Sequence, residues 1–278
     1  MEVRWSNLHF LGIVQRQIES FIHEYAVSFK FIRKIEDHTK TMQVSIFLLC
    51  YNEELMLPHT LKHYRTRFPS ARITIFDNYS TDRSATIAQD AGCRVIKYDS
   101  KEQQDEKLLI WIRSHLWKDY VDKGWVIMCD MDEWLDATEE DLKVEEGKGT
   151  TILMTQGINM VGESKVEDYS DIDLFEIKKG YLDDNMSKRI CFQYPAISME
   201  FWYGAHKCFP QGRIQYSEKT YFLKHYDFLG AEYLVAKHKR RYERNEVSRM
   251  NGINQHYMKE REKSLQIYQT ALSKALVL

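Results

Sequence analysis

The chain has 278 residues, and its 39 Lys or Arg and 41 Asp or Glu leave a formal net charge of −2, which argues against nucleic acid as a partner. At roughly 150 residues per domain this length predicts one or two domains, and no apolar run approaches the roughly 20 residues that span a bilayer. The five cysteines show no C-x-x-C spacing and three fall inside apolar runs, so with no signal peptide visible we expect reduced thiols and a cytoplasmic location.

Residues 10–35 carry apolar side chains on one stripe, which predicts a long amphipathic helix inside an N-terminal extension, residues 1–42. This apolar stripe must be buried against another surface. The chain's own domain, a second copy in a homodimer or a peripheral membrane contact would each supply one, and the basic side chains beside the stripe suit the last of these.

From residue 43 the pattern changes to short apolar runs that alternate with helical patterns. The runs at 44–50, 72–77, 93–99 and 125–130 predict buried parallel strands. Between them we expect a helix that ends before Pro69, a helix over 80–92 capped by Ser80 or Thr81 and stopped by Gly92, and a longer helix over 102–120. This alternation predicts an α/β fold with a doubly wound, mostly parallel sheet flanked by helices.

After residue 145 the alternation fades. We expect a strand at 150–160, a loop-rich acidic stretch over 161–190, a strand within 213–228 that ends at His225, a basic helix over 230–242 and an amphipathic helix over 257–278. The predicted organisation is therefore a main α/β domain over 43–245, in halves 43–136 and 137–245, followed by a C-terminal helical segment over 246–278.

Polar side chains gather at three of the predicted strand ends, where ligands of such sheets bind. They are Asn52 and Glu53, Asp77 and Asn78, and Asp130 and Asp132. The run "CDMDEWL" crowds three acids into four positions, so either solvent screens them or something positive lies among them. Paired carboxylates suit Mg²⁺ or Mn²⁺, which in turn bridges a diphosphate. A second D-x-D, in "SDIDLF", follows no long buried strand and is interpreted as a solvated turn.

Three segments, "FLLCYNEELMLPHTLKHY", "ITIFDNYSTDRSATIAQDAGCRVIKYD" and "WVIMCDMDEWL", together resemble family-2-type glycosyltransferases of the GT-A fold, in the branch with a D-x-D-E-[FW] metal motif. The resemblance covers about residues 43–136 and implies a nucleotide-sugar donor, UDP- or GDP-linked. It implies that Asn52 and Glu53 lie beside the ribose and base, that Asp77 reads the base edge with Asn78 next to it, and that Asp130 and Asp132 form the diphosphate–metal motif. Asp132 is the more direct ligand in this interpretation, while Glu133 and Trp134 could be structural.

The segments "GAHKCF" and "FLKHYDFLGAEYLVAKHKRRYER" resemble the second half of the same branch. By that likeness His225 completes the metal or phosphate site, and Lys237 with Arg240 or Arg241 steadies the diphosphate. The alternatives are a satisfied core histidine and a solvated basic helix face. Neither is excluded by the sequence.

The resemblance implies a metal-dependent transferase that moves one sugar, with inversion, to a glycan, lipid-linked or other acceptor. An inverting transferase needs a carboxylate as general base, and the candidates are Glu200, Asp184 and Asp227. The Q-x-x-R-W motif of processive synthases is absent.

Three other functions are weighed against this one. A sugar-nucleotide pyrophosphorylase needs a glycine-rich phosphate loop where "CYNEELMLP" has no glycine, and a D-x-D-x-T phosphatase needs Thr where Trp134 stands. A non-catalytic module of the same fold that binds a glycan or a protein partner stays open, because the general base is unassigned.

Overall fold

The computed structural model describes residues 42–250 and 260–278. Its central sheet begins with four parallel strands in the spatial order β3 (Arg94–Lys97), β2 (Arg72–Asp77), β1 (Val44–Cys50) and β4 (Gly124–Asp130). All seven side chains of β1 are buried. A continuous apolar run of this kind is what a strand covered on both faces requires.

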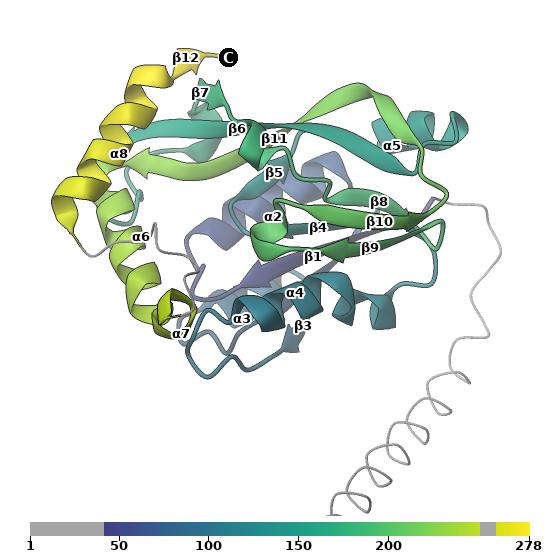
Figure 1. The fold of residues 1–278 in the computed structure, drawn as a ribbon, viewed down its shortest axis with the longest axis horizontal. Helices are drawn as coiled ribbons and strands as arrows, with labels where there is room; N and C mark the ends of the chain where they lie inside the picture. Colours follow the sequence, from purple (N-terminus) through teal and green to yellow (C-terminus); the bar gives the residue numbers. More distant parts are fainter. Residues whose placement is uncertain (1–41, 251–259) are drawn as a thin grey trace, which may run out of the picture. The chain divides into compact units, whose positions relative to one another are not determined.

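Helices cover both faces of these parallel strands (Figure 1). Ile46 and Leu48 of β1 pack with side chains of α2 (Met56–Arg67) and α3 (Ser84–Asp90). The alternate residues Phe47 and Leu49 pack with α4 (Glu106–Ser114) and the 3₁₀ turn η1 (Leu116–Tyr120). The expected α/β class, with a mostly parallel sheet flanked by helices, is confirmed.

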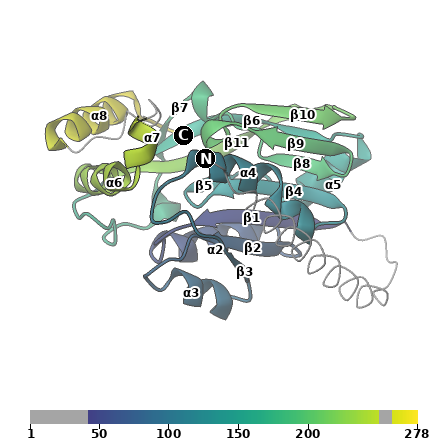
Figure 2. The same cartoon turned by 60° about the horizontal axis from the view of Figure 1, so that its bottom comes forward.

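The sheet continues beyond β4 through antiparallel neighbours. The order is β8 (Cys191–Tyr194), β6 (Ile152–Ser164), β7 (Lys179–Leu182) and β12 (Leu276–Val277). The long strand β11 (Tyr216–Gly230) runs parallel to β6 and antiparallel to β5 (Glu133–Leu135), which directly follows the acidic turn. The hairpin of β9 (Ile197–Phe201) and β10 (Cys208–Gly212) lies beside β8 (Figure 2), and α5 (Glu139–Gly147) precedes β6.

Three helices complete the described part of the chain: α6 (Ala231–Arg244), α7 (Glu246–Met250) and α8 (Arg261–Lys274). Leu234 of α6 and Tyr268 and Ala271 of α8 bury one shared apolar cluster with Val161 of β6. The two helices lie side by side at one end of the sheet (Figure 1). Among the described residues, no helix combines the length and the apolar character needed to cross a membrane.

Several expected boundaries differ from the structure. The helix expected over 80–92 begins at Ser84, because Ser80 and Thr81 accept hydrogen bonds from Asn52 in the neighbouring loop instead of capping the helix. Gly92 does follow the helix, with φ +72°. The helix expected over 102–120 divides into α4 and η1, and β11 continues past His225 to Gly230. The amphipathic helix expected within residues 1–42 lies outside the described residues.

Candidate active site

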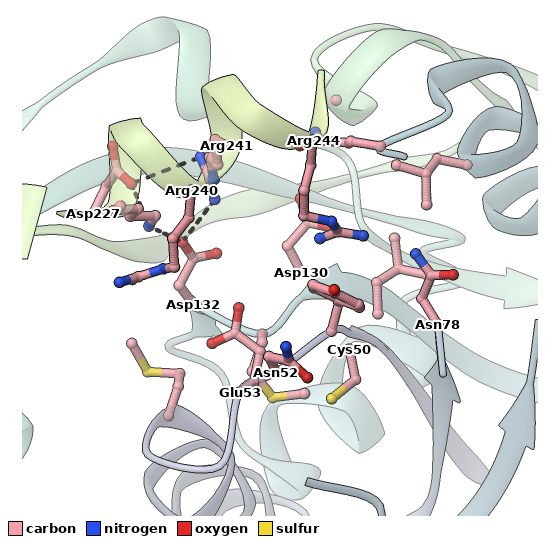
Figure 3. A pocket seen from close by; sticks show the side chains of 18 of the residues that line it. Cys50, Asn52, Glu53, Asn78, Asp130, Asp132, Asp227, Arg240, Arg241 and Arg244 are labelled. Atoms are coloured by element: carbon pink, nitrogen blue, oxygen red, sulfur yellow. Dashed lines mark hydrogen bonds and ion pairs between the residues drawn. The ribbon is translucent and has the colours of Figure 1, made fainter. Parts of the chain in front are cut away.

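A cavity of about 900 Å³ lies at the carboxyl ends of β1 and β4. Its lining combines the loop after β1, the acidic turn after β4 and one face of α6. Figure 3 shows Arg240, Arg241 and Arg244 on α6, with Asp130 and Asp132 below them and Cys50, Asn52 and Glu53 beyond. The strand ends named from the sequence therefore converge on one cavity, as parallel strands dictate.

The turn that carries Asp132 is held by polar side chains of α2. Thr60 donates to the carbonyl of Met131 (2.7 Å), the His63 Nε2 lies 3.0 Å from the carbonyl of Leu135, and the Tyr64 hydroxyl donates to the carbonyl of Glu133 (2.8 Å). Trp134, 1% exposed, packs beneath the turn and donates from Nε1 to Thr60. These contacts give hydrogen-bond partners to buried carbonyls of the turn and of β5.

Two cations of the chain hold the first acid of the motif. Arg113 of α4 donates to Asp130 (2.7 Å), and Lys188 lies 3.7 Å from the other oxygen of Asp130 while also contacting Glu133. Burial alone would raise the pKa of Asp130, but Arg113 and then Lys188 outweigh it and lower that pKa. The positive charge that the crowded acids require is thus partly supplied by Arg113 and Lys188.

The second acid of the motif belongs to a separate group with two residues of β11. One ligand atom each from Asp132, His225 and Asp227 lies within 4.8 Å of the others. The backbone N–H of Tyr226 donates to the Asp132 carbonyl (2.8 Å), and alternate residues of a strand share one face. The hydrogen bond fixes β11 against the acidic turn, and His225 and Asp227, on either side of Tyr226, lie beside Asp132. Asp130 is not part of this group among the described residues.

His225 is oriented by a chain of hydrogen bonds from β6. Asn159 donates from Nδ2 to Asp183 (2.8 Å), which turns its Oδ1 toward the Nδ1 of His225 (3.0 Å). The His225 Nδ1 must then donate, so Nε2 is the nitrogen that faces Asp132 Oδ2, 3.5 Å away. Against the effect of burial, Asp132 raises the pKa of His225. An Nδ1 held by a hydrogen bond, with Nε2 directed at the other ligands, is also how metal-binding histidines are oriented.

Cations of α6 complete the group. Lys237 donates to Asp132 Oδ2 (2.8 Å) and contacts Asp227, while Arg241 lies 3.8 Å from Asp132 and 3.9 Å from Asp227. Burial would raise the pKa of Asp132, but Lys237 first and then His225 lower it well below its usual range. The same neighbours hold the pKa of Asp227 below its ordinary value, against burial.

Glu53 also lines the cavity, but the nearby cations do not outweigh the effect of burial on its pKa. Burial, and then the nearby charge of Asp132, raise the pKa of Glu53 to about 7, although Lys237 and Arg241 act in the opposite direction. A carboxyl with this pKa exchanges its proton near neutral pH, which is typical of functional sites.

The other residues expected at the nucleotide differ in their burial and in their hydrogen-bond partners. The side chain of Asn52 bonds to the backbone of Thr81 and Asp82, and the Asn78 amide pairs with Ser100. Asp77 is fully buried and is not among the described residues that line the cavity; its Oδ1 accepts from the backbone of Ser80, and its Oδ2 has no hydrogen-bond partner in the described structure.

The three expected general bases fall in different places. Asp227 lines the cavity, but neither Glu200 nor Asp184 is among the described residues that do. Glu200 lies 3.6 Å from His115 and 3.7 Å from Lys118, and Asp184 is exposed and accepts a hydrogen bond from Gln156. Lys237 and Arg240, for which diphosphate binding was expected from the sequence, both line the cavity.

No family model matches the chain. Protein RfbJ of Shigella flexneri is 30% identical over 98 residues, which cover 35% of this chain and 70% of RfbJ. The chain belongs to the family of RfbJ.

Solved structures with a similar fold were also found for this RfbJ-family chain. TarS of S. aureus is 11% identical, with 83% of this chain and 49% of TarS covered and a TM-score of 0.42. Glucosyl-3-phosphoglycerate synthase of Mycobacterium tuberculosis is 17% identical, with 42% of this chain and 44% of the synthase covered and a TM-score of 0.29. The mannosyltransferase PcManGT of Pyrobaculum calidifontis is 12% identical, with 57% of this chain and 48% of PcManGT covered and a TM-score of 0.29. This chain spans about half the length of each of these structures or less.

Three residues of the RfbJ-family site were not found from the sequence. Arg113 stands next to the apolar face of its helix, Lys188 lies in a stretch without periodicity, and Arg244 places its guanidinium 3.2 Å from the centre of the Tyr51 ring at the cavity wall. The crowding of acids signalled that cations were needed. It did not say which ones, because their approach depends on tertiary packing.

Proposed function

We propose that this RfbJ-family protein is a metal-dependent glycosyltransferase that moves one sugar from a UDP- or GDP-sugar to a glycan, lipid-linked or other acceptor, with inversion. The observation that carries the proposal is the group of Asp132, His225 and Asp227 opposite the basic face of α6, in a cavity at the strand ends. Carboxylates suit a dication, and Lys and Arg suit a diphosphate.

The donor set supports Mn²⁺ or Mg²⁺ as the cofactor. Two carboxylates and an imidazole can converge within 4.8 Å, and the contact of Lys237 with both carboxylates shows that this group already accommodates a cation. Asp132, His225 and Asp227 would hold the ion, which when bound neutralises the leaving diphosphate. Asp130, expected from the sequence as a second metal ligand, is engaged by Arg113 and Lys188, and we propose that it supports the turn.

The chain's own residues then divide the remaining tasks. Lys237 and Arg240 would bind the diphosphate, and Asn52, Glu53 and Asn78 would lie along the nucleoside. The unpartnered Oδ2 of Asp77 supports a hydrogen bond with an N–H of the base, because a buried acceptor without a donor is costly.

In the transfer step the bond between the anomeric carbon and the diphosphate breaks, the acceptor oxygen bonds to that carbon, and the hydroxyl proton passes to a carboxylate of the protein. Lys237 and Arg241 keep the pKa of Asp227 low, so Asp227 is a weak base and serves better as a ligand.

Donor hydrolysis with Mn²⁺ present tests the proposal, because a transferase without acceptor slowly releases the nucleoside diphosphate. We expect Asp132→Asn to lower the release of UDP or GDP at least about 100-fold, as loss of a main charge-stabilising group does. The matched control is Asp173→Asn in the exposed second D-x-D, where the amide oxygen can keep the hydrogen bond with Phe175. Its rate should stay within about twofold of wild type.

The opposite result would point to the binding module. If no UDP- or GDP-sugar is turned over by the wild-type chain, yet these donors bind with unchanged affinity to Asp132→Asn, the transferase proposal is wrong.

A further inference from the structure

Lys237 lies where a cation between the proposed metal ligands would lie. Its side chain is 8% exposed, its Nζ donates to Asp132 Oδ2 at 2.8 Å, and the same Nζ contacts Asp227. An ammonium that bridges two carboxylates neutralises them in the way that a bound ion would.

The oxygen at the centre of the group is already surrounded by positive or potentially positive atoms. Asp132 Oδ2 lies 2.8 Å from Lys237, 3.5 Å from His225 Nε2 and 3.8 Å from Arg241. A dication at this oxygen would meet an ammonium within bonding distance of the same atom. At such separations like charges repel by several kcal/mol even at the intermediate dielectric of a protein (about 4 kcal/mol per unit pair at 4 Å).

The pocket offers Lys237 a second position. Lys237 lines the cavity together with Arg240 and Arg241, all on one side of α6 (Figure 3 shows the two arginines). A lysine ammonium is a compact charge on a flexible four-carbon stem, so it can change partners without movement of the helix. A diphosphate in the cavity would supply the new anionic partner.

We propose that Lys237 is an internal counter-ion, which occupies the cation position of the Asp132–His225–Asp227 group while the cavity is free of ligand and moves to the donor's diphosphate when metal and nucleotide enter. This rests on the proposed function. Its consequence is regulatory, because the metal alone competes with Lys237, whereas the nucleotide removes the competitor. Metal and nucleotide should therefore bind cooperatively, and the coupling must be reciprocal.

Mn²⁺ binding to the full chain without nucleotide is the direct test, measured from the electron paramagnetic resonance signal of free Mn²⁺. We expect Lys237→Met to bind Mn²⁺ about tenfold or more tightly than wild type, because the competing charge is gone. The matched control is Lys239→Met, exposed on the same helix, which should bind like wild type. The double variant Asp132→Asn/Lys237→Met should lose the gain, which locates the ion at this group.

Two further measurements use the same proteins. In wild type, saturating UDP or GDP should tighten Mn²⁺ binding at least about tenfold, and in Lys237→Met this coupling should fall by at least about threefold, to the part that direct attraction between the ion and the diphosphate supplies. Melting temperatures test the same proposal even if a variant is less stable than wild type. Without metal Lys237→Met should melt below wild type, because two buried carboxylates lose their ammonium, and Mn²⁺ should raise its melting temperature more than that of wild type.

The outcomes separate this inference from the proposed function. Equal or weaker Mn²⁺ binding by folded Lys237→Met, with an unchanged nucleotide coupling, overturns the counter-ion role while leaving metal-dependent transfer intact. Absence of Mn²⁺ binding by every form, with UDP or GDP present, overturns both the counter-ion role and the metal site.

Discussion

Near the cavity, the buried charges of Glu133 and Lys188 form an ion pair with a structural role. Glu133 is 1% exposed, and Lys188, which contacts it, is 4% exposed. Burial lowers the pKa of Lys188, but Glu133 and then Asp130 reverse this and raise it, so the ammonium stays charged. A buried ion pair of this kind adds little net stability, yet loss of one partner leaves an uncompensated charge.

We therefore expect Lys188→Met to lower the free energy of unfolding by about 3–5 kcal/mol, because Glu133 would remain buried without its cation. Urea unfolding followed by circular dichroism measures the change. The double variant Glu133→Gln/Lys188→Met removes both charges and should recover more than half of the loss.

An exposed ion pair supplies the control for Lys188→Met. Lys179 pairs with Glu163 at the surface, so Lys179→Met should cost no more than about 1 kcal/mol. If Lys188→Met costs as little as this surface substitution, the buried pair does not have the role assigned to it.

At the scale of elements, α2 and β5 determine where Asp132 points. Thr60, His63 and Tyr64 of α2 hold the backbone of the turn and of β5, and the His63 ring stacks on Trp134 at 5.0 Å. Burial lowers the pKa of His63 to about 4, although the Leu135 carbonyl acts against this. The imidazole is thus held neutral in the folded chain.

This shift predicts a pH dependence for the attachment of α2. The folded pKa of His63, about 4, lies below its usual value of 6.5, so between these values the unfolded chain binds more protons. His63 therefore contributes its full stability above about pH 6.5 and loses it as the pH falls toward about 4, by about 3 kcal/mol at most.

Melting temperatures between pH 4 and 7 should accordingly fall more steeply in wild type than in His63→Gln, whose amide can still donate to Leu135 but does not titrate. The difference between the two curves isolates His63 from the other acids. Parallel curves would contradict the buried, neutral imidazole.

The strands also show how much of the fold can be predicted from the sequence. β1, β2 and β4 were predicted closely because continuous apolar runs leave few alternatives for a strand. The strands β8 and β9 were not predicted, since four or five residues carry little periodicity and form only by pairing with β4 and β10. In the site, the convergence of Asp132 with His225 was implied by the family resemblance, whereas the approach of Lys188 to Glu133 depends on a loop whose path no local pattern specifies.

At the scale of the whole molecule, the cavity joins two parts of the chain that are distant in sequence. The strand ends after β1 and β2 supply the proposed nucleoside contacts, and β11 and α6 supply His225, Asp227 and the basic face. A nucleotide that touches both parts should stabilise the fold as a unit, because a ligand that binds only the folded state raises its stability.

A thermal-shift comparison of UDP, GDP, ADP and CDP, each with Mn²⁺, tests this and selects the base. At about 100 times its dissociation constant, the correct nucleotide adds about 2.7 kcal/mol, which corresponds to a rise of roughly 5–10 °C for a domain of this size. Asp77→Asn should remove much of that rise for the selected nucleotide, because an amide presents a donor as well as an acceptor toward the base. Asp90→Asn, an exposed substitution at the end of α3, should keep it. If all four nucleotides shift wild type equally and Asp77→Asn changes none of the shifts, Asp77 does not read the base, and selection of the donor must come from the sugar instead.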